Sequence, residues 1–510
     1  MSRVNNAIKN IKFSMFFYIL FIVVQFVSRK IFLENLGDEF MGLTGTLQSF
    51  LKFLNLAELG IGTAVGFSLY KPIIENNTVK INELLNLFGY LYKRIGLLII
   101  GVGVLLSLFF PIIFNTLSLS LLVVYFAFYT FLIGTCTNFF FNYHIFLLEA
   151  DQKNYVITSY SQSINLIKII IQCVLVVYFQ SFYLWIFLEL CYFIAFSILL
   201  RRKVFKEYPW LDMKNTATKS ILKTHPELIT KIKQISIHKF GAFVTNGTDQ
   251  ILIFAFISIE SVAFFGNYQL IFNKLLQLIN TSFAGTGAGI GNLVAENKTI
   301  QIKKVFWEMM ALRFYIAGIL FIVLQLIVEP FIVLWLGEKY ILEQSVLILF
   351  LTNMFIMQIR VPVDHFKDAY GLFQDTWAPI VQSIINLGAS VILLNYFGLT
   401  GILLGTLIAF TLIILIWRPY FLYKMGFKES VWIYWKGFLK LTASLAIAFY
   451  ICEYVFNDVL TLKKESYYDI ILLGIKTTCI TLLVYTPIIF LSNEGFRDVS
   501  KRIFNLIRRK

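Results

Sequence analysis

Uninterrupted apolar runs of about 18 residues or more recur from one end of this 510-residue chain to the other. Wound as an α-helix, each run is long enough to cross a hydrocarbon core about 30 Å thick. Charged residues make up 14% of the chain, against about 25% in an average soluble domain. The sequence therefore predicts an all-α polytopic membrane protein, with no soluble domain left over.

Counting the apolar runs predicts about fourteen transmembrane helices. No small-residue cleavage site follows the first run, so this run is expected to remain as a membrane span. The predicted spans are 13–33, 42–69, 92–113, 118–148, 155–179, 182–200, 236–258, 262–290, 310–335, 344–366, 376–396, 399–422, 432–455 and 467–491.

Clusters of Lys and Arg on alternate loops predict the orientation of the spans, because cytoplasmic loops retain positive charge. The clusters are Lys71, Lys80, Lys93 and Arg94; residues 201–239; Lys298, Lys303 and Lys304; Lys424 and Lys428; and the tail from Arg508 to Lys510. Both termini are therefore expected in the cytoplasm, which requires an even number of spans. This pattern explains most of the net charge of +15. A nucleic-acid partner is unnecessary, and the basic tail is expected to contact anionic membrane lipids.

An internal repeat appears when the chain is compared with itself at an offset of 221 residues. The second span then aligns with the eighth in the same orientation, as in transporters built from parallel repeats. The matched residues are Glu39, Gly45, Gln48, Leu54, Gly66, Glu75, Asn76, Thr78 and Ile81, each identical to its counterpart. The predicted domains are an N-terminal six-helix lobe (1–200), a basic cytoplasmic linker (201–235), a C-terminal six-helix lobe (236–424), and two C-terminal helices with a basic tail (425–510).

Polar residues inside the predicted spans are candidates for function, since an ionisable group in a bilayer is costly and normally faces protein or water. In the second span, Lys52, Asn55, Glu58, Gly62 and Gly66 recur every three or four residues. That spacing predicts one polar, small-residue face along a helix. A hydrogen bond from Glu58 to a neighbouring helix is the simpler alternative to a functional role.

The cations predicted to bind substrate, together with Asn55, come from both lobes: Arg29, Lys52, Lys168, Lys274, Arg313 and Arg360. For these side chains the alternative is snorkelling to the nearer membrane surface. Several buried cations favour an anionic substrate, because charge in a low-dielectric cavity needs counter-charge, and phosphate supplies it. The carboxylates Glu58, Asp249 and Asp364 are candidates for binding a coupling proton or Na⁺.

Metal and disulfide chemistry is not indicated. The five cysteines are isolated and mostly lie in apolar runs, and the four histidines lack ligand spacing. We expect no metal site and no cofactor other than a coupling ion.

Two segments resemble a known family: the stretch from Leu33 to Ile73, with LENLGDEFMG, NLAELGIG and SLYKPI, and the stretch AGTGAGIGNLVAENKT. They are similar to the matching regions of bacterial oligosaccharide flippases, the Wzx-like O-antigen and polysaccharide exporters. These proteins belong to the superfamily that also contains multidrug exporters and the lipid II flippase. The likeness in span count, repeat and basic linker extends over nearly the whole chain.

The resemblance implies a multi-pass protein of the bacterial inner membrane. Such a protein would move an undecaprenyl-diphosphate-linked oligosaccharide from the inner to the outer leaflet by alternating access, together with other polysaccharide-assembly membrane proteins. The residues agree with this expectation, because a headgroup of diphosphate and hydroxyls cannot cross hydrocarbon unaided. Cations would hold the diphosphate, and Asn and Gln side chains would meet the sugars.

Three other readings remain. A membrane polymerase or glycosyltransferase would need catalytic acids or a large outer loop, but the sequence has no Asp-x-Asp motif and its longest outer loop is short. An enzyme is therefore not expected. An ion-coupled multidrug exporter shares the architecture but would favour an acidic or aromatic cavity for cationic drugs. A purely structural membrane protein would have no reason to place ions in both lobes.

Overall fold

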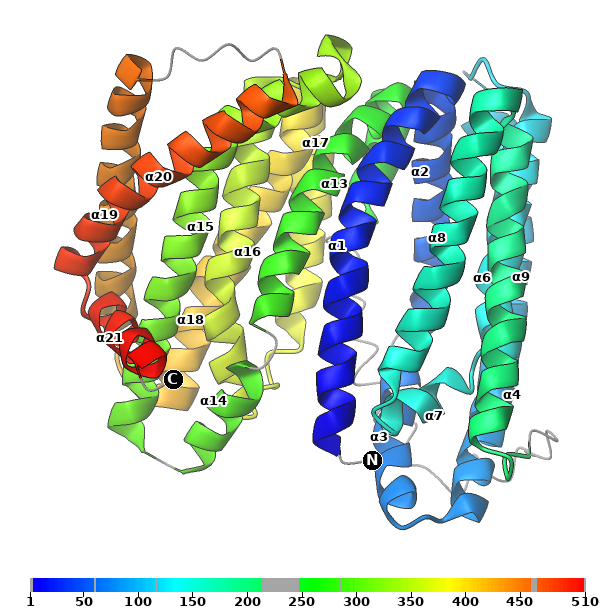
Figure 1. The fold of residues 1–510 in the computed structure, drawn as a ribbon, viewed down its shortest axis with the longest axis horizontal. Helices are drawn as coiled ribbons and strands as arrows, with labels where there is room; N and C mark the ends of the chain where they lie inside the picture. Colours follow the sequence, from blue (N-terminus) through cyan, green and yellow to red (C-terminus); the bar gives the residue numbers. More distant parts are fainter. Residues whose placement is uncertain are drawn as a thin grey trace. The chain divides into compact units, whose positions relative to one another are not determined.

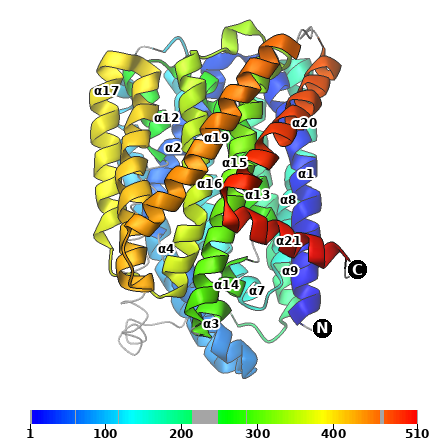
Figure 2. The same ribbon diagram turned by 90° about the vertical axis from the view of Figure 1, so that its left-hand side faces the viewer.

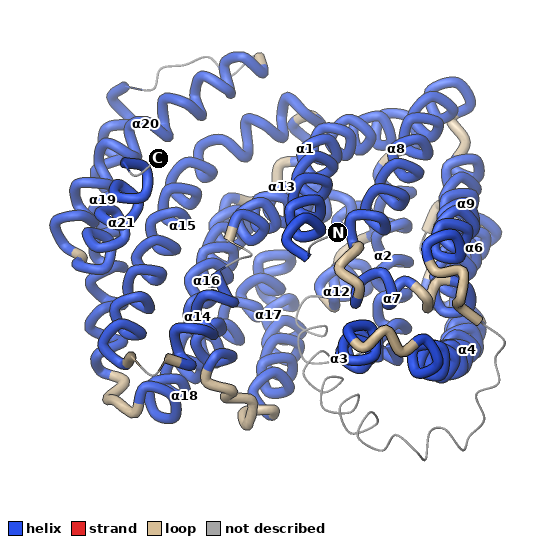
Figure 3. The backbone as a smooth tube through the Cα atoms, turned by 60° about the horizontal axis from the view of Figure 1, so that its bottom comes forward, coloured by secondary structure: helices blue, strands red, loops and turns tan. Residues whose placement is uncertain are grey.

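The computed structural model describes residues 3–58, 61–115, 117–212, 247–283, 286–296, 298–459 and 466–508. Within these ranges the regular elements are all helices, and Figure 3 shows helix joined by short loops. The chain divides into two compact units, Met1–Ala263 and Phe264–Lys510, which we describe one at a time.

Ten helices in the described ranges are long and apolar enough to cross a membrane, so the protein is a multi-pass membrane protein. The segment Trp377–Phe427 has 51 residues, which as one straight helix would be roughly 76 Å long, more than twice the hydrocarbon thickness. It bends at Gly398, whose φ of 54° and ψ of −130° are not helical. The bend falls between the two spans predicted at 376–396 and 399–422, and both of these stay predictions.

The first unit is a bundle in which α1 packs on α8, α8 on α9, α9 on α6, and α6 on α4 (Figure 1). Helix α2 packs against α6 and α12. The elements are α1 (Arg3–Leu36), α2 (Asp38–Leu54), η1 (Asn55–Glu58), α3 (Ile61–Ile74), α4 (Thr78–Ser107), α5 (Phe110–Ile113), α6 (Leu121–Phe141), α7 (Ile145–Ala150), α8 (Asn154–Phe179), α9 (Phe182–Glu207) and α12 (Asp249–Phe256).

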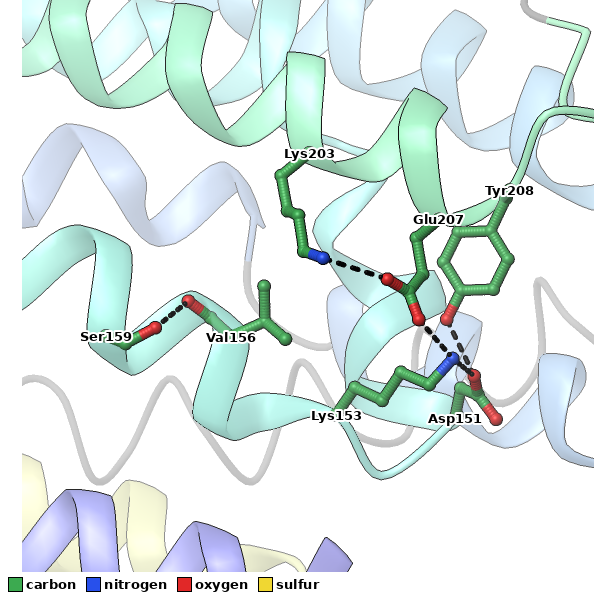
Figure 4. A network of polar contacts seen from close by, with 7 residues as sticks. All are labelled: Asp151, Lys153, Val156, Ser159, Lys203, Glu207 and Tyr208. Atoms are coloured by element: carbon green, nitrogen blue, oxygen red, sulfur yellow. Dashed lines mark hydrogen bonds and ion pairs between the residues drawn. The ribbon is translucent and has the colours of Figure 1, made fainter. Parts of the chain in front are cut away.

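An ion-pair network joins the turn before α8 to the end of α9 (Figure 4). Lys153 Nζ lies 2.8 Å from Asp151 Oδ2 and 3.0 Å from Glu207 Oε1, and Lys203 pairs with the other oxygen of Glu207 at 3.0 Å. The Tyr208 hydroxyl donates to Asp151 at 2.7 Å. Burial, followed by the hydrogen bond to Asp151, raises the pKa of Tyr208, so its hydroxyl stays a donor.

The same end of the first unit carries its basic loops. Asn82, near the start of α4, donates to the carbonyl of Trp210, which follows α9, and α3 packs against α7. The α3–α4 turn, the α7–α8 turn and the end of α9 therefore lie together. Lys71, Lys80 and residues 201–203 lie in or beside these segments, so parts of two predicted basic clusters lie at the same end of the unit. The cytoplasmic location of this end stays a prediction.

The second unit is built around α15, which packs against α16, α20 and α21, while α19 packs against α20 (Figure 2). Its core contains a cluster of aromatic rings around Phe306. The elements are α13 (Ile259–Ser282, whose first turn belongs to the first unit), α14 (Thr286–Ala295), α15 (Thr299–Leu336), η2 (Glu338–Tyr340), α16 (Gln344–Ala369), α17 (Trp377–Ala409), η3 (Phe410–Trp417), α18 (Arg418–Phe421), η4 (Leu422–Phe427), α19 (Trp432–Val459), α20 (Tyr467–Ser492) and α21 (Glu494–Arg508).

The end of α3 and the start of α4 are separated from the equivalent bounds of α14 and α15 by the repeat offset of 221 residues. Helix α3 ends at Ile74 and α14 ends at Ala295, while α4 begins at Thr78 and α15 begins at Thr299. In each unit the repeated segment contains two helices, α2 then α3 and α13 then α14. Only the ends of this segment keep the offset, because α2 ends at Leu54 whereas α13 continues to Ser282, seven residues beyond the position equivalent to Leu54.

The interruption corrects one prediction. An unbroken helix over 42–69, with a single continuous polar face, was wrong: α2 ends at Leu54, Asn55–Glu58 form a 3-10 turn, and α3 begins at Ile61. Asn favours helix caps over helix interiors because its side chain competes for backbone groups. Helices α4 and α15 also begin earlier than the spans predicted at 92 and 310, since their first turns are polar and fall below a hydropathy threshold.

The count of fourteen spans and the cytoplasmic placement of both termini stay predictions, as do the domain boundaries at 200, 235 and 424. Most of the predicted linker, from residue 213 on, and the first part of the predicted span 236–258 lie outside the described residues.

Candidate functional site

The end of α2 presents a cation beside the helix interruption. Lys52 lies in the last turn of α2, is exposed, and makes no ion pair or hydrogen bond with the described part of the chain. Asn55 caps the helix, its backbone N–H donating to the Leu51 carbonyl. The side-chain oxygen of Asn55 is buried without a hydrogen-bond partner among the described residues. The interruption thus offers a positive charge and a polar oxygen that are not used by the fold.

Glu58 lies at the other end of this interruption, opposite two further polar groups. The Tyr92 hydroxyl of α4 donates to Glu58 Oε1 at 2.8 Å, so the hydrogen bond to a neighbouring helix that the sequence allowed is present. Burial, and then the charge of Glu58, raise the pKa of Glu149 on α7. Two carboxylates and a phenol hydroxyl therefore lie near one another in the first unit, an arrangement suited to holding a proton or a cation.

Arg29 and Lys168 are tied into the first unit by the fold. An Nη2–H of Arg29 donates to the Ala263 carbonyl at 3.0 Å, joining α1 to the start of α13. Lys168 Nζ lies 2.8 Å from Glu189 Oε1, with side chains only 11% and 18% exposed. Gln172 donates to the same oxygen at 3.0 Å. Lys168 therefore already has a buried counter-charge.

Asp249 is the first residue of α12 and is only 9% exposed. Its Oδ1 has no hydrogen-bond partner in the described ranges. The next residue along, Gln250, accepts a hydrogen bond from Ser49 of α2 at 2.8 Å. Asp249 thus stands at a helix beginning that is packed against α2.

Arg313 of α15 is the most deeply buried candidate cation, 2% exposed. Its Nη1 donates to Gln358 Oε1 at 2.6 Å, and its guanidinium lies over the Phe283 ring, 4.4 Å from the centroid. Both partners are neutral, and no carboxylate lies within ion-pair distance among the residues that the structure describes. A buried charge without counter-charge is strongly unfavourable, so Arg313 stays a candidate for binding an anion.

Arg360 and Asp364 belong to an ion cluster that the sequence only partly indicated. Asp364 Oδ2 lies 3.2 Å from Arg360 Nε, one helical turn away on α16. Its Oδ1 lies 2.5 Å from Arg418 Nη1 of α18. Two guanidinium groups share one carboxylate, so this cluster has a surplus of one positive charge. Arg418 escaped prediction because it lies near the end of a span, where snorkelling is the usual explanation.

Lys274 is half-buried on α13. On another face of the same helix, Asn273, Gln277 and Asn280 are exposed. Sequence reasoning concentrated on ionisable groups and missed these amides, although their spacing of three and four residues was visible. It also passed over Lys476, which is exposed on α20 opposite the face that carries its buried threonines.

Four of the six predicted cations differ in whether they have a carboxylate partner. Lys168 and Arg360 have carboxylate partners, whereas Lys52 and Arg313 have none within the described part of the chain. The structure brings Glu58 together with Tyr92, and Asp364 together with Arg360. The Lys and Arg side chains can bind an anion, and the carboxylates can bind a proton or a metal cation such as Na⁺.

No protein-family model matches this chain, and no curated protein matches it. Solved structures do match. The lipid II flippase MurJ in an inward closed conformation gives a TM-score of 0.65 at 15% sequence identity, covering 94% of this chain and 99% of the flippase. An inward-facing multidrug resistance transporter of the MATE family, in the MOP superfamily, gives 0.60 at 13% identity, covering 80% of this chain and 94% of the transporter.

A third match is a MOP superfamily transporter from Pyrococcus furiosus, described by the reverse polarity of its binding pocket. It gives a TM-score of 0.54 at 12% identity, with 84% of this chain and 98% of the transporter covered. At such low identities the likeness establishes the fold. The chain shares the fold of these membrane transporters along almost their whole length.

Proposed function

We propose that this protein is a flippase that translocates an undecaprenyl-diphosphate-linked oligosaccharide from the cytoplasmic to the outer leaflet for cell-surface polysaccharide assembly. The fold shared with a lipid II flippase supports the proposal. So do the segments that resemble the Wzx-like exporters. Translocation would proceed by alternating exposure of the binding side chains to the two leaflets. The bacterial inner membrane is the proposed location, with the basic end of the first unit in the cytoplasm.

The observation that carries this proposal is the buried charge of Arg313, which has no carboxylate partner among the described residues. Its guanidinium is buried among neutral groups, and the interior of a span provides no water to screen it. A diphosphate brings negative charge and acceptor oxygens, and a guanidinium binds such oxygens through two parallel hydrogen bonds. Lys52, exposed beside the helix interruption of the first unit, is a further cation that can bind negative charge.

Coupling to a proton or Na⁺ gradient is assigned to the carboxylates. Glu58, with Tyr92 and Glu149 close by, is the leading candidate, because a bound cation would relieve the repulsion between the two carboxylates. Asp249, with one buried oxygen lacking a partner in the described ranges, is a second. Asp364 is already neutralised by two arginines, so its role is to hold Arg360. We propose no other cofactor and no catalytic reaction.

The test is translocation of a fluorescent undecaprenyl-diphosphate oligosaccharide by purified protein in proteoliposomes. Arg313→Met keeps the volume but removes the charge, and Lys52→Ala removes the second cation. Both should lower the translocation rate at least tenfold without reducing protein yield. Lys71→Ala is the matched control, since Lys71 is an exposed lysine of the same interrupted helix whose pair with Glu75 at 3.8 Å faces solvent.

Normal translocation by Arg313→Met and Lys52→Ala would remove the diphosphate-binding role. In the same vesicles, Glu58→Gln should change the dependence of the rate on pH or on Na⁺. An unchanged dependence would remove Glu58 as the coupling site.

An ion-coupled exporter of small molecules is the second candidate function. The similarity to MATE transporters favours it, as does the pair of carboxylates at Glu58 and Glu149, which could hold an organic cation. This reading predicts efflux of a cationic dye such as ethidium from everted vesicles, inhibited by Glu58→Gln and unaffected by Arg313→Met.

A further inference from the structure

Helix α13 has two chemically different faces in the second unit. Phe265, Tyr268 and Phe272 are buried, and all three rings pack on Phe350 of α16 at centroid distances of 5.0, 5.9 and 5.1 Å. The spacing of three and four residues places these rings on one side of the helix. This side packs α13 against α16, and other sides of the helix are not used in this contact.

A ladder of amide side chains occupies an adjacent open face. Gln269, Asn273, Gln277 and Asn280 follow one another at intervals of four, four and three residues, so they fall on one face. Asn273, Gln277 and Asn280 are exposed, and none of their side chains forms a hydrogen bond to the described ranges of the chain. From first to last, the ladder rises roughly 16 Å along the helix.

Such a face is incompatible with hydrocarbon. Each amide has two donors and an acceptor, and groups of this kind facing lipid would remain unpaired at a large cost in free energy. The face therefore meets water or a polar ligand. Because it carries amides and no charge, it does not select an anion or an organic cation.

The internal repeat gives the ladder a counterpart of different chemistry. At the offset of 221 residues, Gln269 corresponds to Gln48 of α2, and Asn273 corresponds to Lys52. Gln48 and Lys52 are both exposed. The same face of the repeated helix thus carries a cation in the first unit and only amides in the second. Lys52 is therefore suited to a phosphate, whereas Asn273 at the equivalent position is suited to neutral hydroxyls.

From these observations we infer that the amide ladder of α13 is the binding surface for the sugar residues of the transported glycolipid. The inference rests on the proposed function and names the site of the glycan within it. Sugar hydroxyls donate and accept hydrogen bonds, as do amides, so each Asn or Gln can pair with a hydroxyl in either direction. A ladder of this length accommodates several sugar units rather than one.

The test compares two lipids binding to the full-length protein in detergent: undecaprenyl diphosphate, and undecaprenyl diphosphate carrying a neutral trisaccharide of hexose and N-acetylhexosamine. The wild-type protein should bind the sugar-bearing lipid more tightly. In the double variant Asn273→Ala with Gln277→Ala, affinity for that lipid should fall about tenfold or more, at roughly fivefold per lost hydrogen bond. Affinity for the sugar-free lipid should not change.

Asn395→Ala is the matched control, because Asn395 is an exposed Asn on α17 whose amide bonds only to Val391 of its own helix. It should leave both affinities unchanged. Wild-type affinities that are equal for the two lipids would overturn the inference while leaving the diphosphate role intact. So would a double variant that loses both lipids equally, or neither. If the wild-type protein bound neither lipid, the proposed function would fail, and the inference with it.

Discussion

The sequence predicts that Lys168 binds substrate. Its ion pair with Glu189 indicates a structural role instead. Lys168→Met replaces the ammonium with an apolar group of similar size and leaves Glu189 with Gln172 as its one donor among the described residues. Both charged side chains are less than one-fifth exposed. Removing one partner of a buried pair costs about 3 kcal/mol, because the other charge stays in a low-dielectric site. That corresponds to roughly a hundredfold change in the unfolding equilibrium.

Replacing both partners, Lys168→Met with Glu189→Leu, should restore most of this stability, because well-packed apolar residues often substitute for a buried ion pair at no cost. Equilibrium unfolding by SDS titration in mixed micelles measures the four proteins of the cycle, and the coupling free energy follows from them. Transport by the stable double variant should persist. A Lys168→Met protein with wild-type stability and no transport would refute the structural role and make Lys168 a substrate ligand.

Three further predictions concern single elements of the fold. Asp364→Asn removes the carboxylate that contacts both Arg360 and Arg418; it should lower the free energy of unfolding by about 3 kcal/mol, and unchanged SDS unfolding would contradict this. Gly134→Ala places a Cβ against the Phe193 ring and should cost about 1–3 kcal/mol, whereas Gly101→Ala, with open space around it, should be neutral or slightly stabilising; equal melting temperatures would refute the packing. His144 is fully buried, and burial, followed by the charge of Arg201, lowers its pKa to about 4 from 6.5. As the pH falls, His144 is protonated in the unfolded chain before it is protonated in the folded protein. The free energy of unfolding therefore has its full value above pH 6.5 and falls by up to about 3 kcal/mol toward pH 4. His144→Phe should lessen that loss in a pH series of melting curves, and an unaltered loss would contradict it.

The helical membrane architecture could be predicted because each crossing needs its own apolar run, and that signal is local. The division at Gly398 is an example: Gly398 lies between two apolar runs, and the chain bends there. The interruption between Leu54 and Ile61 was missed because the apolar run continues through it, although Asn55 and Gly60 are both poor helix formers.

The candidate site was less predictable, because a single sequence does not show which charges meet. Nothing in the sequence assigns Glu189 to Lys168, 21 residues away, or Arg418 to Asp364, 54 residues away. Burial of Arg313 against neutral partners likewise depends on how α15 and α16 pack. By contrast, the amides of α13 carried a periodic signal, and a search for all polar side chains at helical spacing would have found them.

The most direct test of the central claim, that Arg313 and Lys52 bind the negative charge of a phospho-glycolipid, is a structure of the protein with undecaprenyl-diphosphate oligosaccharide bound. The account predicts phosphate oxygens within about 4 Å of the Arg313 guanidinium or the Lys52 ammonium. A diphosphate bound elsewhere, with both cations unoccupied, would contradict it.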